Sequence, residues 1–214
     1  MTATRGQIDR ELRERWGWTP YRVIGGVALF GCAAVLVCDF IMWALLLPDY
    51  SPLSGTISEL GAGPHHDLQD AGLVLFVIGI LALFGGLVLR GEACTRAYVV
   101  RGAFLLLAID ITLIALVNEY GDGDTGGMVL HPYFVGALYV LVAVLLWLGP
   151  TVEPTKGSSW AKLGRVLAVI WVLTAPFFYM VPDSINGAYE RFLGLIMVAS
   201  VAIAAYELLR HPEH

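Results

Sequence analysis

Hydroxyl, carboxylate and imidazole side chains gather in one short connector, YSPLSGTISELGAGPHHD at residues 50–67, between two long apolar segments. Within it, Ser54 and Ser58 offer hydroxyl nucleophiles, and Glu59 offers a carboxylate for general acid–base catalysis. His131, which opens a later apolar segment, adds a second group able to move a proton near neutral pH. We therefore take these four residues as a hypothetical catalytic set.

A purely structural interpretation of the connector competes with the catalytic one. The run TISE at 56–59 fits a capping box, in which the Thr56 hydroxyl and the Glu59 carboxylate each accept the other residue's backbone amide. The glycines at 61 and 63 and the proline at 64 then end the helix. The sequence thus predicts a short interfacial helix. Either it is only a capped turn, or it covers a pocket and points Ser54, Ser58 or Glu59 inward.

Two acids lie inside apolar segments and are candidate ligand-binding residues. Asp39 stands eight residues before the apolar run ends at Leu47, and Asp110 lies near the middle of a later run. A carboxylate at that depth costs about 3 kcal/mol on insertion scales, so we expect both acids to face the bundle interior with a partner. A structural hydrogen-bonded pair and a role in a pocket or proton relay both remain open.

Three more ligand-binding candidates lie in later connectors: Glu119, Glu190 and Arg191. The Arg191 guanidinium has the fork geometry that binds an anionic head group through two hydrogen bonds. Alternatively, Arg191 pairs with an acid of the protein itself, for which Glu59, Asp39 and Asp110 are the candidates.

The sequence assigns no metal ligands and leaves any cofactor unknown. His65 and His66 are adjacent, so on a helix they point to different sides, and no HxxxH spacing occurs. The loop NEYGDGDTGG at 118–127 lacks the closing glutamate of a calcium loop. The net charge of −5 and the absence of Walker and GxGxxG patterns give no support to a nucleic-acid partner or a nucleotide-driven pump.

The elements that position these residues must be membrane helices. The chain of 214 residues is 57% hydrophobic and only 14% charged, against about 25% charged in a soluble domain. Apolar runs of roughly 20 residues span a bilayer as helices, because backbone amides find no water in lipid. We predict an all-α membrane protein, a six-transmembrane-helix bundle with a short extracytoplasmic interfacial helix after the first span. The expected spans are about 23–47, 72–89, 98–117, 130–148, 164–181 and 192–209.

Basic residues predict the orientation of this bundle. Of the 13 Lys and Arg residues, all except Arg191 fall in the two tails or in the even-numbered connectors and adjoining helix ends. The positive-inside rule then predicts a plasma-membrane protein with both termini cytoplasmic. The expected organisation is a cytoplasmic amphipathic tail at 1–21, a six-span domain at 22–209 and a cytoplasmic tail at 210–214.

The chain also resembles a family of prokaryotic membrane proteins, the domain-of-unknown-function family 998 (DUF998). The resemblance rests on YSPLSGTISELGA at Tyr50–Ala62, on LHPYF at Leu130–Phe134 and on GAYER at Gly187–Arg191, and it covers essentially the whole chain. His65 and His66 are not part of it, which weakens them as site residues. The resemblance implies a six-span fold and supplies no reaction.

Three functions are compatible with this pattern. Residues of three connectors (Ser58, His131 and Arg191 among them) can meet in a compact bundle, with Asp39 and Asp110 beneath them. The first hypothesis is a protein that binds a membrane lipid or small amphiphile in a pocket open to the extracytoplasmic face. The second is a membrane-embedded hydrolase or lipid- or prenyl-modifying enzyme, and the third is a proton-coupled transporter. The oligomeric state stays open.

Overall fold

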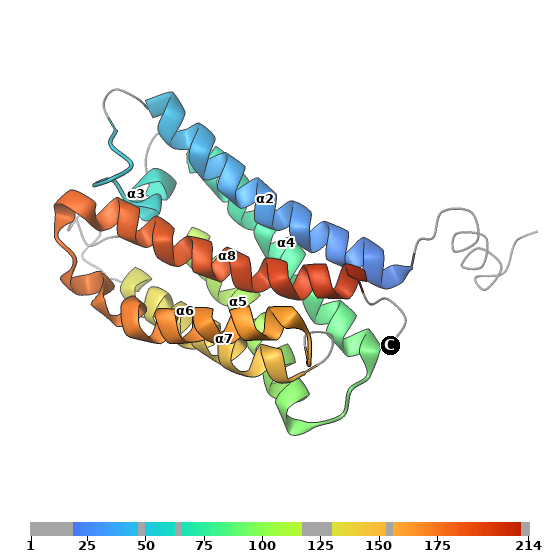
Figure 1. The fold of residues 1–214 in the computed structure, drawn as a ribbon. Coiled ribbons are helices and arrows are strands. Elements are labelled where there is room, and N and C mark those ends of the chain that lie inside the picture. The colour runs from blue at the N-terminus through green and yellow to red at the C-terminus, as the bar shows by residue number, and fades with distance from the viewer. Residues whose placement is uncertain (1–18, 47–49, 63–65, 117–129, 153–155, 211–214) are drawn as a thin grey trace, which may run out of the picture.

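Six long helices and one short helix make up the protein in the computed structural model, which describes residues 19–46, 50–62, 66–116, 130–152 and 156–210 (Figure 1). The candidate residue Glu119 and most of the two tails lie outside these ranges. The α-helices are α2 (Pro20–Leu46), α3 (Ile57–Ala62), α4 (His66–Arg90), α5 (Thr95–Leu116), α6 (His131–Leu148), α7 (Ser159–Thr174) and α8 (Asn186–Arg210). Short 3₁₀ helices are η1 (Gly149–Thr151), η2 (Ala175–Met180) and η3 (Asp183–Ile185).

The six-span helix bundle predicted from hydropathy is confirmed. Within the described ranges, six helical stretches are long and apolar enough to cross a membrane, the fifth being α7 together with η2. Their outward faces carry many exposed large hydrophobic side chains, such as Phe30, Leu106 and Val140. Such faces suit contact with lipid chains rather than water. The protein is an integral, multi-pass membrane protein.

Five of the six spanning helices begin earlier than the sequence predicted, the second and the sixth by the largest margin. The second span starts at His66 rather than Gly72, and the sixth at Asn186 rather than Phe192. Hydropathy locates the apolar part of a helix, whereas the helical backbone continues into polar first turns that the apolar run does not include. The consequence is functional, because both additional segments contribute residues to the site described below.

Close helix contacts in the bundle depend on glycines. α2 packs along α4 and also contacts α8 (Figure 1). A Cβ atom on Gly31 of α2 would lie 2.5 Å from the Leu75 carbonyl oxygen of α4, and one on Gly72 would lie 2.8 Å from the Cys38 Cβ. Small residues allow such approach of helix backbones in membranes, where van der Waals packing drives helix association. This packing fixes the end of α2 that carries Asp39 against α4.

Pro176 changes the fifth span from α-helix to 3₁₀ helix, as its lack of a backbone donor predicts. The α-helix ends at Thr174 and η2 continues to Met180. The Thr174 carbonyl accepts a hydrogen bond of 2.7 Å from the Tyr189 hydroxyl of α8. A carbonyl at a helix end thereby obtains a partner, and the fifth span is joined to the start of the sixth.

Candidate functional site

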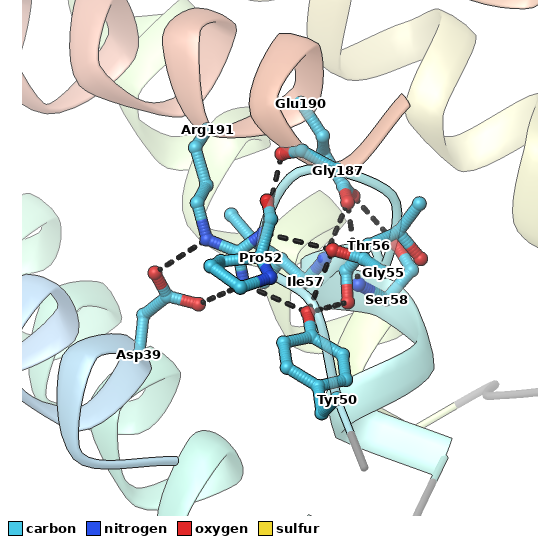
Figure 2. A network of polar contacts seen from close by, with 10 residues as sticks. All are labelled: Asp39, Tyr50, Pro52, Gly55, Thr56, Ile57, Ser58, Gly187, Glu190 and Arg191. Atoms are coloured by element: carbon cyan, nitrogen blue, oxygen red, sulfur yellow. Dashed lines mark hydrogen bonds and ion pairs between the residues drawn. The ribbon is translucent and has the colours of Figure 1, made fainter. Parts of the chain in front are cut away.

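Arg191 and Asp39 form a bidentate ion pair at the end of the bundle that carries α3, which we call the α3 end (Figure 2). The Arg191 Nε donates to Asp39 Oδ2 and Nη2 donates to Asp39 Oδ1, each over 3.0 Å. Arg191 lies in the second turn of α8 and Asp39 near the end of α2. The expected internal pairing of Arg191 is thus confirmed, and Asp39 is the partner among the three candidate acids.

The remaining donors of Arg191 hold the loop that leads into α3. Nη1 donates to the carbonyl oxygens of Pro52, Gly55 and Gly187, over 3.0, 2.8 and 3.2 Å. Nη2 also donates to the Tyr50 hydroxyl over 2.9 Å. All five N–H groups of the guanidinium therefore have acceptors within the protein. Arg191 in this arrangement organises structure and has no donor left for an anionic ligand.

Tyr50 stabilises the same loop through hydrogen bonds to its backbone. Its hydroxyl donates to the carbonyl of Gly55 over 2.6 Å, and the Thr56 carbonyl is a second acceptor at 3.1 Å. Burial raises the pKa of Tyr50 above its ordinary value, so the hydroxyl remains protonated and keeps this donor role. A side chain on Gly55 would overlap the Tyr50 ring, and one on Gly187 would overlap the Gly55 backbone. Glycine at both positions lets the loop pack directly on α8.

Glu190 caps α3 from another helix. Its Oε2 accepts from the backbone N–H groups of Ile57 and Ser58, at 2.5 and 3.5 Å, and its Oε1 accepts from the Ser58 hydroxyl at 2.8 Å (Figure 2). A carboxylate at this position satisfies donors that a helix start leaves without partners and complements the helix dipole.

The predicted capping box at the start of α3 is also confirmed. The Thr56 hydroxyl accepts from the Glu59 amide and the Glu59 carboxylate accepts from the Thr56 amide, both over 3.0 Å. Together with the bonds to Glu190, this gives every N–H group of the first turn an acceptor. The start of α3 is therefore not available to bind an anion.

Ser58 connects the carboxylate of Glu190 to His131. Because the one Ser58 hydroxyl hydrogen is directed to Glu190, its oxygen is left to accept from His131 Nε2, which lies 3.4 Å away. His131 begins α6 and is 4% exposed, and Pro132 follows it in the first turn, where its missing backbone donor costs nothing. The order carboxylate–serine–histidine places the hydroxyl in the middle. A serine hydrolase instead places the histidine between the other two groups.

A cavity of about 250 Å³ lies directly under these residues. Its walls are mostly apolar and come from all seven α-helices that the structure describes, with Leu36, Ile114 and Leu138 as examples. The polar and charged side chains of its lining are Asp39, Ser58, Gln69, Asp70, Tyr139, His131, Glu190 and Arg191, with the indole of Trp171. An apolar chamber with a few converging polar groups is the usual form of a small-ligand site.

Gln69 and Asp70 were not among the candidates drawn from the sequence. Gln69 is 1% exposed, and neither atom of its side-chain amide finds a hydrogen-bond partner in the part of the chain that the structure describes. The Oδ1 atom of Asp70 is also buried without a hydrogen-bond partner among the described residues. Both residues precede Gly72, where the apolar run begins, so hydropathy assigns them to the connector. A polar pair just before a long apolar run was the only available signal.

Other candidate residues lie outside the cavity lining. Ser54 is exposed on the loop, and the exposed Glu59 uses its carboxylate in the capping box. Asp110 is buried in α5, and its Oδ2 has no hydrogen-bond partner among the described residues. Within these same ranges, no group of three His, Cys, Asp or Glu side chains could hold a metal ion.

A family model described as "Protein of unknown function (DUF998)" matches residues 29–207. The chain belongs to this family. The match runs from the third turn of α2 almost to the end of α8 and so includes residues of all six spans. No curated protein and no solved structure matches the chain.

The three segments on which the DUF998 resemblance rested meet at the α3 end. Residues 50–62 form the loop and α3, His131 opens α6, and residues 187–191 form the first turns of α8. The first and third are joined by Arg191 and Glu190, and the second contacts Ser58. The motif residues of this DUF998 protein thus form one polar network above a cavity.

Proposed function

We propose that this DUF998 protein binds a membrane lipid or small amphiphile in the cavity at the α3 end. One observation carries the proposal: an apolar chamber of about 250 Å³ whose polar side chains, such as Ser58, Gln69 and His131, collect together. An amphiphile matches this division, because its chain fits the apolar walls and its head group meets the polar residues.

A route from the lipid phase supports the same function. An open apolar groove of about 500 Å³ lies between α6 and α7, lined by exposed side chains such as Val140 and Trp147. Tyr139 and Trp171 line both the groove and the cavity. The Trp171 Nε1 donates to the Tyr139 carbonyl over 2.9 Å, and their rings meet edge to face. An amphiphile entering sideways from the bilayer would pass this pair.

We place the cavity on the extracytoplasmic side of the plasma membrane, with both termini in the cytoplasm. In the described ranges, the α3 end carries a single Lys or Arg, which is Arg191. The opposite end carries Arg90, Arg96 and Arg165, among others. This asymmetry is the positive-inside signal.

The binding function is tested by measuring the lipid retained by the purified protein. Ala115 lines the cavity, whereas Ile109 of the same helix is 48% exposed on the outside of the bundle. We expect quantitative mass spectrometry to find one amphiphile per wild-type chain, retained in Ile109→Trp and lost in Ala115→Trp, because the added ring fills the cavity. Equal recovery from both variants, or no stoichiometric amphiphile in the wild type, would contradict the proposal.

A second candidate function, a lipid-modifying hydrolase, has one observation in its favour. The Ser58 hydroxyl lies 3.4 Å from His131 Nε2, as in a nucleophile and its general base. Two features weigh against it: the hydroxyl donates to Glu190, and the nearby α3 amides are occupied and cannot form an oxyanion hole. A fluorophosphonate probe that labels wild-type protein but not Ser58→Ala would favour the enzyme. Proton-coupled transport has less support, because Asp39 is held by Arg191.

A further inference from the structure

We infer that the head group recognised in this cavity is uncharged and bears hydroxyl groups, as in a fatty alcohol or a glycerol monoester. The inference rests on the proposed binding function and adds the chemical class of the ligand. Three observations carry it: the buried amide of Gln69, the charge balance of the lining, and the engagement of every Arg191 donor.

Gln69 specifies a partner that both donates and accepts hydrogen bonds. Its side chain lines the cavity and is 1% exposed, and its oxygen and nitrogen both lack partners among the described residues. Leaving such a group unsatisfied is unfavourable, so a ligand that satisfies it gains a corresponding advantage. The amide oxygen needs a donor and the amide nitrogen needs an acceptor. A hydroxyl group supplies both.

The charges around the cavity disfavour an anionic head group. Asp39, Asp70 and Glu190 line the cavity, and Arg191 is the one Lys or Arg among the lining residues that the structure describes. Arg191 already directs its N–H groups to Asp39, Tyr50 and the loop carbonyls. A carboxylate or phosphate entering the cavity would therefore face the Asp70 oxygen without a cationic donor to offset the repulsion.

An ammonium head group satisfies the acceptors of the site but not its donor. It would donate to the Asp70 Oδ1 atom and to the Gln69 oxygen, but it carries no acceptor for the Gln69 nitrogen. A hydroxyl-bearing head group donates to the same oxygens and also accepts from that nitrogen. The volume of about 250 Å³ lies just below the usual range of about 300–1,000 Å³ for ligand pockets. The cavity therefore suits a head group with part of one chain.

The test compares three probes of equal chain length on the full-length protein in detergent: monodecanoylglycerol, decanoic acid and decylamine. At about pH 8 the acid is anionic and the amine is cationic. Binding is measured by native mass spectrometry on wild type, Gln69→Leu and Leu73→Met. Leu73 also lines the cavity, and leucine-to-methionine conserves volume.

We expect wild-type protein to bind monodecanoylglycerol about tenfold or more tightly than either charged probe. Gln69→Leu should remove that preference by weakening monodecanoylglycerol binding more than binding of either charged probe, whereas Leu73→Met should retain it. Gln69→Leu should also raise the thermal stability of the ligand-free protein, because it removes buried groups without partners.

The outcomes separate this inference from the proposed function. If all three probes bind equally and Gln69→Leu changes none of them, the head-group inference is overturned while binding in the cavity stands. Tighter binding of decylamine or decanoic acid overturns it as well. If no probe binds any variant, the proposed function and the inference fail together.

Discussion

Arg191 and Asp39, 152 positions apart in the sequence, are joined by two hydrogen bonds of 3.0 Å between a guanidinium edge and both oxygens of one carboxylate. Both side chains are 16% exposed. The pair fastens the start of α8 to the end of α2, and the remaining Arg191 donors fasten the loop between them. The polar network above the cavity is therefore built around this one side chain.

Removing one member of this pair should destabilise the protein strongly. Arg191→Met leaves Asp39 buried without its counter-ion, which typically costs about 3–5 kcal/mol of stability. Arg191→Lys should recover only part of that stability, because an ammonium group cannot donate two parallel hydrogen bonds to one carboxylate. Arg96→Met, at an exposed arginine of α5, is the matched control and should change stability by less than about 0.5 kcal/mol. Denaturant titration in detergent measures all three. Equal stability of Arg191→Met and Arg96→Met would show that the pair is dispensable.

Gly187→Ala should disrupt the contact between α8 and the loop. A methyl group at that position would overlap the Gly55 carbonyl, which is backbone and also accepts from Arg191. Gly102→Ala in α5 is the control, because its Cβ would meet nothing within 4 Å and alanine favours a helix. Thermal unfolding should show a lower midpoint for the first variant only. A midpoint for Gly187→Ala at or above wild type would mean that the loop can move away at no cost.

Glu190→Gln should loosen α3 without unfolding the bundle. The variant loses a charged acceptor of the Ile57 and Ser58 amides, and such hydrogen bonds contribute about 1.5–3 kcal/mol. We expect amide hydrogen exchange in residues 57–60 to accelerate by about tenfold or more. Glu59→Gln removes an equal charge from an exposed side chain, where water screens its bond to the Thr56 amide, so its effect should be small. Unchanged exchange in Glu190→Gln would contradict the capping role.

The orientation is open to a labelling experiment. Ser54 at the α3 end and Arg96 at the opposite end are both exposed, so each can carry a cysteine in a Cys94→Ser background, with Cys32 and Cys38 buried. If the basic end faces the cytoplasm, as we propose, a membrane-impermeant maleimide should label Ser54→Cys in intact cells and Arg96→Cys only after permeabilisation. The reverse pattern would place the cavity on the cytoplasmic side.

Composition and local spacing alone determined the membrane class, the six helices and the capping box. Long apolar runs can only be helices in lipid, because their amides must bond within the segment. Thr56 and Glu59 are three residues apart, so their reciprocal bonds are a local property of one helical turn. Pro176 and Pro132 act on their own backbone, so the altered fifth span and the start of α6 are local properties of the sequence too.

Only the tertiary structure decided which of these groups meet. Three acids were possible partners of Arg191, and the packing of α8 on α2 selected Asp39. Nothing local could show that Glu190 would cap a helix more than a hundred residues earlier, or that Gln69 would be buried in a cavity wall. Such pairings depend on how helices cross and on which faces approach, and a single sequence encodes them only through many weak packing contacts.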